Sequence, residues 1–218
     1  VGDERITADQ IVIATGQRAS VPNVTGSQFF HDSRDFLSIE DLPAHITFIG
    51  AGIISLEFVS LVTKLGTKAT VLVHGNRALR AFNDDYVKRI IAGLEAEGVK
   101  CYFNESVAEV KAEGNQYQVT THSGLEIKTD YVLDATGRVP NIEGLNLEKA
   151  GVSYTAQGIV VNEFMQANGD NVYASGDVVD KHIPRLTPTA TFESNYIAAH
   201  ILGVPTPIKY PAIPSVVY

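Results

Sequence analysis

The residues best suited to chemistry in this sequence are Gly50, Gly52 and Ser55, which follow an apolar stretch at residues 46–49. Gly50 is free to take a backbone conformation closed to other residues, and Gly52 lets the chain approach a ligand without a Cβ. A helix that starts directly after such a turn presents free N–H groups and its positive dipole end to an anion. The pattern therefore predicts a site for a dinucleotide pyrophosphate, with Ser55 as a small residue in the third glycine position. The residues of this turn are Gly50, Ala51, Gly52, Ile53, Ile54 and Ser55.

The end of the next predicted strand indicates which dinucleotide binds. Apolar residues at helical spacing continue beyond the turn, Gly66 ends the helix, and residues 69–73 read as the following parallel strand. Such sites carry an acid at this strand end for NAD, or a cation for the 2′-phosphate of NADP. His74 stands there instead of an acid, and Arg77 and Arg80 follow. We therefore predict a preference for NADPH over NADH, with His74 and Arg80 as phosphate contacts and Arg77 as a weaker candidate. The alternative is that the two arginines are only a solvated surface pair.

Composition and charge limit the class of protein. With 218 residues and 44% hydrophobic content, the chain is long enough for one large or two small domains with a proper core. The net charge of −8 argues against a nucleic-acid partner, which needs clustered Lys and Arg. The longest apolar stretches are far below the roughly 20 residues that a membrane span requires. No signal peptide is recognisable, so we expect a cytoplasmic protein without a membrane partner.

Cysteine and histidine content argues against a metal site. The single cysteine, Cys101, excludes an internal disulfide and a cysteine-based zinc site. It lies in a short predicted strand, where we expect it to pack as a small apolar side chain. The six histidines have no metal-ligand spacing, so no metal is expected.

The order of the predicted elements indicates an α/β fold. After the first βαβ unit come a helix and a strand, then short strands separated by turns around Gly114 and Gly124, and a closing strand. Parallel βαβ units followed by an antiparallel meander are typical of a Rossmann-like nucleotide-binding domain. The predicted bounds are a helix at residues 84–97 and strands at 99–103, 107–111, 116–121, 125–129 and 130–134.

The central unit is expected to be inserted into another domain. Residues 6–15 read as a strand with no partner nearby, residues 158–161 and 171–174 as further strands, and residues 189–202 as a helix. The predicted organisation is a strand and crossover at 1–22, a linker at 23–42, a nucleotide-binding domain at 43–134 and the remainder of the outer domain at 135–205. Residues 206–218 are expected to be a second linker and the start of an interface domain.

Further motifs occur in a fixed order around the glycine turn. They are Val-Ile-Ala-Thr-Gly at residues 12–16, Ala-Thr-Gly-Arg-Val-Pro-Asn at 135–141 and Tyr-Ala-Ser-Gly-Asp at 173–177. This combination resembles the pyridine nucleotide–disulfide oxidoreductases, the flavoprotein family that includes glutathione reductase, lipoamide dehydrogenase and mercuric reductase. The resemblance covers nearly the whole chain. It implies a Rossmann-like NAD(P)-binding domain inserted in part of an FAD-binding domain.

The resemblance also implies roles for residues of the nicotinamide site. The two Ala-Thr-Gly segments, with Thr15, Gly16 and Gly137, correspond to the crossovers between the two domains, and Gly137 lies beside NAD(P)H. Glu57 matches the family acid near the nicotinamide, although it is otherwise explained as a carboxylate on the helix surface. Members similar to glutathione reductase commonly carry a Tyr that covers the nicotinamide pocket, and Ile53 stands there in this chain.

For FAD, Asp177 matches the acid that binds the ribityl hydroxyls, and the alternative is a turn or helix-capping Asp. Thr187 lies in Leu186-Thr187-Pro188, which matches the segment whose backbone approaches the flavin ring. The family's N-terminal FAD glycine motif, redox cysteine pair and C-terminal His-Glu pair are absent from this sequence. We therefore expect a fragment without catalytic residues of its own, from a homodimeric enzyme that passes hydride from NAD(P)H through FAD to a disulfide or similar acceptor. Two alternatives remain: an NADH oxidase or peroxidase with a single redox cysteine, and a non-catalytic nucleotide-binding module, against which Asp177 argues.

Overall fold

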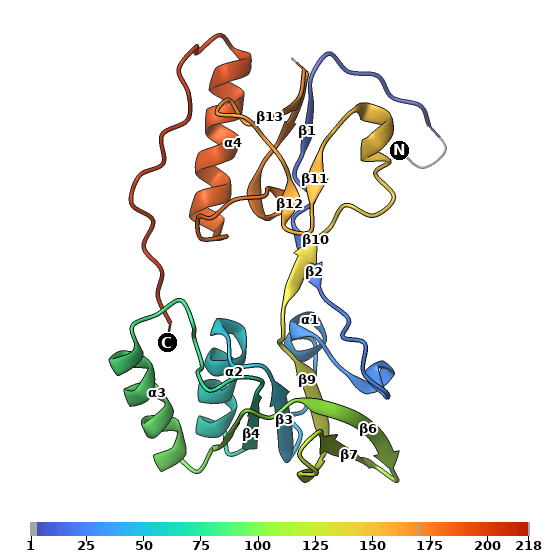
Figure 1. Cartoon of the computed structure of the whole chain (residues 1–218), viewed down its shortest axis with the longest axis vertical. Coiled ribbons are helices and arrows are strands. Elements are labelled where there is room, and N and C mark those ends of the chain that lie inside the picture. The colour runs from blue at the N-terminus through green and yellow to red at the C-terminus, as the bar shows by residue number, and fades with distance from the viewer. Residues whose placement is uncertain (1–3, 170, 218) are drawn as a thin grey trace. The chain divides into compact units, whose positions relative to one another are not determined.

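The computed structural model describes residues 4–169 and 171–217, and the chain forms two compact units (Figure 1). Unit 1 consists of the segment that ends at Arg18 and the segment Arg138–Ser215. Unit 2 consists of Ala19–Gly137 together with the residues from Val216 onward. Unit 2 is therefore flanked in sequence by the two segments that fold together as unit 1.

Unit 2 is built on a four-stranded parallel sheet in the order β5-β4-β3-β9. Helix α2 (Ile53–Lys64) joins β3 to β4, and α3 (Asp84–Ala96) joins β4 to β5. A three-stranded antiparallel meander, β6-β7-β8, precedes β9 in the chain. The predicted α/β fold, with a parallel sheet and an antiparallel excursion, is confirmed. The strands are β3 (His45–Ile49), β4 (Lys68–Val73), β5 (Lys100–Phe103), β6 (Val107–Glu113), β7 (Gln116–Thr121), β8 (Glu126–Thr129) and β9 (Tyr131–Asp134).

The parallel sheet is buried on both faces, which explains its nearly continuous apolar strands. Because successive side chains of a strand point to opposite faces, alternate residues belong to different clusters. Ile46, Phe48, Val71, Val73 and Leu133 pack with α2 and α3, whereas Ile49, Leu72 and Val132 pack with the meander. The helices and the meander therefore pack against opposite faces of the same sheet.

The segment expected as a linker at residues 23–42 carries structure of its own: a 3-10 turn, η1 (Ser27–Phe29), and a short helix, α1 (Ser33–Leu37). Asp32 caps the start of α1 with a capping box. The Asp32 carboxylate accepts the backbone N–H of Asp35, and the Asp35 carboxylate accepts the backbone N–H of Asp32. Phe36 is buried in the cluster of apolar side chains that the sheet forms with α2 and α3, called the helix-side cluster below. This packing makes the segment part of unit 2.

Unit 1 contains the small sheet β1-β14-β13, in which β1 and β14 are parallel. The strand expected at residues 6–15 is much shorter, because β14 offers only three residues for pairing. The helix expected at 189–202 begins earlier, at Thr187, since Pro188 is tolerated in a first turn. The elements are β1 (Ile11–Ile13), β2 (Gln17–Ala19), β10 (Arg138–Pro140), η2 (Leu147–Ala150), β11 (Tyr154–Thr155), β12 (Gly158–Ile159), β13 (Gln166–Asn168), β14 (Val172–Ala174), η3 (Gly176–Val178) and α4 (Thr187–Ile201).

Cys101 lies in β5, half-buried against the helix-side cluster of unit 2. Burial, with a smaller contribution from Glu95, raises the pKa of its thiol to about 11. This position agrees with the expectation that Cys101 packs as a small apolar side chain. Among residues 4–169 and 171–217, no helix is long and apolar enough to cross a membrane.

Candidate functional site

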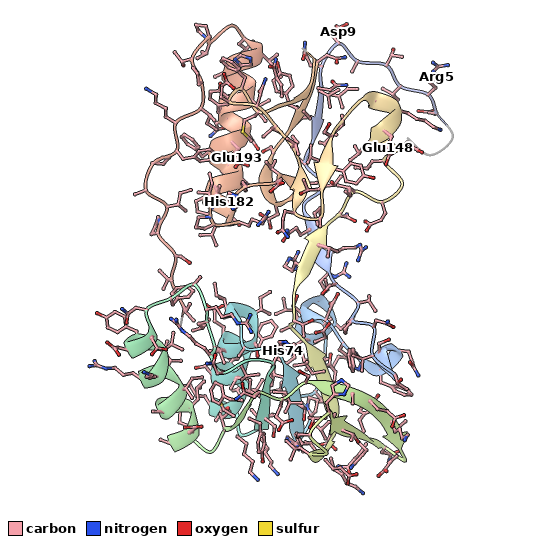
Figure 2. All side chains as sticks on the ribbon, in the orientation of Figure 1. Arg5, Asp9, His74, Glu148, His182 and Glu193 are labelled. Carbon is pink, nitrogen blue, oxygen red and sulfur yellow. The ribbon has the colours of Figure 1, made fainter. Side chains whose placement is uncertain are left out.

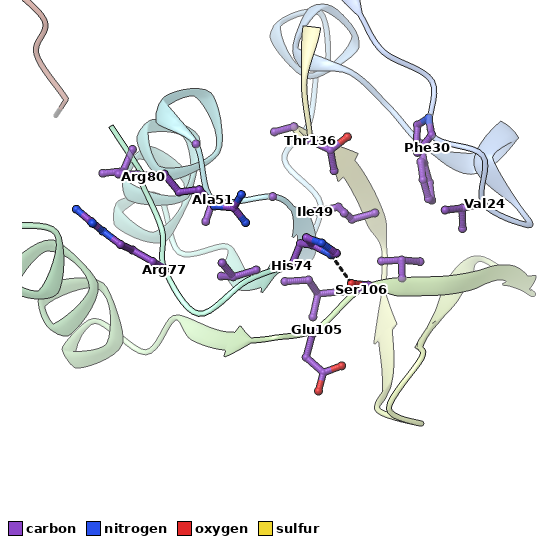
Figure 3. A pocket seen from close by; sticks show the side chains of 18 residues that line it. Val24, Phe30, Ile49, Ala51, His74, Arg77, Arg80, Glu105, Ser106 and Thr136 are labelled. Carbon is purple, nitrogen blue, oxygen red and sulfur yellow. Dashed lines mark hydrogen bonds between the residues drawn. The ribbon is translucent and has the colours of Figure 1, made fainter. Parts of the chain in front are cut away.

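A cavity of about 520 Å³ lies in unit 2 at the carboxyl ends of β3, β4 and β9. In open α/β sheets this edge is where ligands bind. The glycine turn after β3 contributes Gly50, Ala51 and Gly52, and the segment after β4 contributes His74, Arg77 and Arg80. The structure therefore brings the predicted pyrophosphate turn and the predicted phosphate contacts into one cavity (Figure 3).

The two glycines of the turn are required for different reasons. Gly50 has φ +95°, and a Cβ there would lie 2.8 Å from the carbonyl oxygen of Ala135, so the fold itself excludes a side chain. Gly52 has an extended backbone, and a Cβ there would meet nothing within 4 Å. Because Gly52 lines the cavity, its missing side chain leaves space for a ligand.

Helix α2 starts immediately after Gly52 and has no side-chain cap and no acidic residue in its first turn. The first N–H groups of a helix have no intrahelical acceptor, so this end attracts anions. The side chains of Ile53, Ile54 and Ser55 do not line the cavity. What these three residues offer a pyrophosphate is therefore their backbone.

Two other predicted residues also lie outside the cavity lining. Glu57 is half-buried further along α2. Gly137 follows the cavity residues Ala135 and Thr136, and its carbonyl accepts bonds from the N–H and hydroxyl of Ser20, each at 3.1 Å. The lining of this cavity thus supports neither residue as a direct contact.

His74 is held by a residue that the sequence pattern did not identify. Its Nδ1 lies 2.5 Å from the hydroxyl oxygen of Ser106, which follows β5 and also lines the cavity. Because Nδ1 is engaged in this bond, Nε2 is the ring nitrogen that remains for a ligand.

The two arginines differ in their surroundings. Arg77 forms an ion pair with Asp84 at the start of α3, with Nε and Oδ1 3.3 Å apart, and also donates to the carbonyl of Phe82. Arg80 is exposed, and its guanidinium lies beside Gly75. In Figure 3, Arg77 extends toward α3 whereas Arg80 extends toward Ala51. Arg80 is therefore the better placed cation for a phosphate, and Arg77 is committed to α3.

One acid, Glu105, does line the cavity, although the end of β4 carries none. Both of its carboxylate oxygens accept the hydroxyl of Ser123 at 2.8 Å. Hydrogen bonding with Thr121 and Ser123 lowers the pKa of Glu105. Figure 3 shows this carboxylate directed away from His74. The Glu105 carboxylate therefore forms hydrogen bonds with hydroxyl groups of the meander and does not face the glycine turn.

A second cavity, of about 460 Å³, lies in unit 1 between the end of β1, η3 and the start of α4. It brings together Gly16, Asp177 and Thr187 from the predicted flavin site. Thr15 is exposed and does not line it. Helix α4, like α2, starts without a side-chain cap or an early acid.

The residues that sequence reasoning missed follow strands that it had found. Thr136 and Ser106 come shortly after the strands expected at 130–134 and 99–103. Because the carboxyl ends of parallel strands meet at one edge of a sheet, their positions after these strands could have indicated that Thr136 and Ser106 lie near the glycine turn. Thr136 is fixed by Asp134, whose carboxylate accepts its N–H at 3.0 Å.

Comparison with known proteins decides the family. The family described as pyridine nucleotide-disulphide oxidoreductase matches residues 1–194. The chain belongs to this family. The resemblance inferred from the motif order is thereby confirmed.

Relatives within the pyridine nucleotide-disulphide oxidoreductase family include reductases of different substrates. The chain is 34% identical to a glutathione reductase from a Nostoc species, over 93% of this chain and 47% of that protein. It is 32% identical to the mercuric reductase of Acidithiobacillus ferrooxidans, over 100% of this chain and 40% of that protein. The HOCl-induced flavoprotein disulfide reductase RclA from Escherichia coli superposes with a TM-score of 0.86 at 28% identity, covering 93% of this chain and 47% of RclA. The chain thus spans about half the length of the relatives it matches.

Proposed function

We propose that this chain supplies the NADPH site and part of the FAD site of an oxidoreductase that passes hydride from NADPH through FAD to a disulfide or similar acceptor. In this proposal, residues 43–134 form the NAD(P)-binding domain. Residues 1–22 and 135–205 belong to the FAD-binding domain, and the whole protein is a homodimer. The main support is the cavity of unit 2, where an open Gly52 and the uncapped start of α2 meet His74 and Arg80.

The residues of the cavity fit a dinucleotide phosphate. The α2 N-terminus offers backbone donors, Gly52 leaves space for close approach, and no carboxylate stands in the first turn of the helix. Arg80 offers a charge-assisted fork for a 2′-phosphate, and His74 adds Nε2 as a second donor. The pyridine nucleotide and FAD would supply the hydride chemistry when bound, while this chain orients them and sets the charge around them.

Residues of the second cavity fit a polyol chain and a flavin edge. Asp177 offers carboxylate acceptors, and the α4 N-terminus at Thr187 offers backbone donors. A bare nucleotide-binding module has no use for this second cavity, which favours the flavoenzyme over that alternative. Glu57 and Gly137 remain proposed nicotinamide contacts on the family resemblance alone.

The affinities of NADPH and NADH test the cofactor preference directly. We expect the wild-type protein to bind NADPH more tightly, and Arg80→Ala to reduce the NADPH-to-NADH preference about tenfold by removing a charge-assisted bond. His74→Glu should move the preference toward NADH, because a carboxylate repels the phosphate and accepts a ribose hydroxyl. Calorimetric titration with both nucleotides measures these ratios.

Arg77→Ala is the matched control. Its guanidinium is committed to Asp84 and Phe82, so removing it should lower stability while leaving the ratio within about twofold. Equal affinity of the wild type for both nucleotides, unchanged in Arg80→Ala, would show the NADPH assignment to be wrong.

A further inference from the structure

Unit 1 contains a fully buried carboxylate that none of the sequence motifs identified. Glu193 lies on α4 (Figure 2) and is 0% exposed. Its Oε2 accepts the backbone N–H of Gly176 at 2.7 Å. Its Oε1 accepts from Lys181 Nζ at 2.6 Å and from the hydroxyl of Tyr210 at 2.8 Å. Burying a carboxylate is costly unless its lone pairs are satisfied in this way.

The donors come from separate parts of unit 1. Gly176 opens η3, Lys181 follows η3, and Tyr210 belongs to the segment after α4. The Lys181 side chain is itself only 6% exposed. Burial raises the pKa of the Tyr210 hydroxyl, and the hydrogen bond to Glu193 raises it further by a smaller amount. One carboxylate therefore links α4, the η3 segment and the segment after α4.

The segment around η3, residues 176–179, is also held through its carbonyl groups; it is called the Asp177 loop below, or simply the loop. Arg185 donates from Nε to the carbonyl of Asp177 at 3.3 Å and from one terminal nitrogen to Val179 at 3.1 Å. Glu193 thus holds the backbone one residue before Asp177, at the Gly176 N–H, and Arg185 holds the backbone directly after the Asp177 Cα, at its carbonyl. The Asp177 side chain stays half-exposed at the second cavity.

We propose that Glu193 is a positioning residue for Asp177: its carboxylate fixes the Gly176–Asp177 backbone so that the Asp177 side chain meets the ribityl hydroxyls of FAD. This inference rests on the proposed role of the second cavity in flavin binding. A buried ion pair contributes little net stability relative to apolar side chains of the same volume. The geometry of the loop, rather than the stability of unit 1, is therefore what the Glu193 network supplies.

Paired double variants of the whole protein separate the two roles. Glu193→Gln alone would leave the Lys181 ammonium buried without a partner, so each variant also carries Lys181→Met. In Glu193→Gln/Lys181→Met the amide oxygen still accepts the Gly176 N–H, and the amide nitrogen faces the Tyr210 hydroxyl. Glu193→Leu/Lys181→Met keeps the volume but has no acceptor. We expect both to fold, because the charge pair is removed as a unit.

Two readouts are measured: the Kd for FAD after reconstitution of the apoprotein, and hydrogen–deuterium exchange at the Gly176 amide. We expect the Glu193→Leu/Lys181→Met variant to bind FAD roughly tenfold more weakly than the Glu193→Gln/Lys181→Met variant. Its Gly176 amide should also exchange faster, because this buried N–H has lost its acceptor. Glu148→Gln is the matched control, since it makes the same change at an exposed carboxylate of unit 1 and should alter neither readout.

Equal FAD affinity and equal Gly176 exchange in the two double variants would overturn the proposal. So would rapid exchange of the Gly176 amide in the wild type, a measurement that needs no variant to fold. If the whole wild-type protein, as opposed to the 218-residue chain alone, binds no FAD, the result would contradict the proposed function instead. The exchange at Gly176 would then still decide whether Glu193 holds the Gly176 backbone.

Discussion

At the scale of single residues, Gly50 is needed for folding, whereas Gly52 is expected to matter for ligand binding. A side chain at Gly50 meets the Ala135 carbonyl in a left-handed conformation, whereas one at Gly52 enters open space in the cavity. We therefore expect Gly52→Val to abolish NADPH binding while changing the unfolding free energy by less than about 1 kcal/mol. Gly50→Val should cost about 1–3 kcal/mol of stability or more. Chemical denaturation and calorimetry measure the two effects, and unchanged NADPH affinity in a folded Gly52→Val protein would contradict the assigned site.

Cys101 gives a second residue-scale prediction. The pKa of its thiol is raised from 9.0 to about 11, chiefly by burial. The thiolate fraction at neutral pH is therefore about a hundredfold lower than in an exposed cysteine, and alkylation should be slower in proportion. The reaction should accelerate only as the pH rises toward this pKa. Iodoacetamide labelling across pH tests this, with a denatured sample as control, and labelling of the native protein at the denatured rate would exclude it.

At the scale of elements, α2 depends on a small residue where it packs on the sheet. Ser55 is 0% exposed, and its hydroxyl has no hydrogen-bond partner within the described part of the chain. Because an unpaired buried hydroxyl is unfavourable, Ser55→Ala should be neutral or stabilise unit 2 by up to about 1 kcal/mol. NADPH affinity should not change, since the helix N–H groups are retained. A large loss of stability in Ser55→Ala would mean that the hydroxyl has a partner.

The elements with strong periodicity were predictable, whereas several of the short ones were not. The strand–helix–strand run from β3 to β4 has buried apolar strands and a helix ended by Gly66, so local pattern and tertiary structure agree. In contrast, β11 with two residues and α1 with five were not predicted, and the strand expected at residues 158–161 forms only as the two-residue β12. Such elements form only because their neighbours supply bonds or a core, as Phe36 of α1 illustrates.

At the scale of the whole molecule, the cavity in unit 2 was predictable only in part. The glycine turn, His74 and Arg80 follow from one βαβ unit, because their spacing is local. Ser106 and Glu105 come after β5, and whether either faces the turn depends on side-chain bonds that no spacing encodes. Glu193 is the extreme example, since its partners Gly176 and Tyr210 lie on opposite sides of it in sequence.

The final prediction is that the 218-residue chain by itself binds NADPH but retains no FAD. Every lining residue of the first cavity falls between Pro22 and Thr136 of unit 2, so the groups proposed to bind the phosphates of NADPH all belong to this chain. The second cavity offers Asp177 and the start of α4, but the sequence carries no glycine motif for the FAD pyrophosphate. A pyrophosphate without its helix N-terminus loses the charge stabilisation on which dinucleotide binding depends. Visible absorption after purification measures retained flavin, and calorimetry with Gly52→Val as control measures NADPH binding. A yellow protein with stoichiometric FAD would contradict this division between the two cavities, because it would mean that unit 1 holds the flavin without that motif.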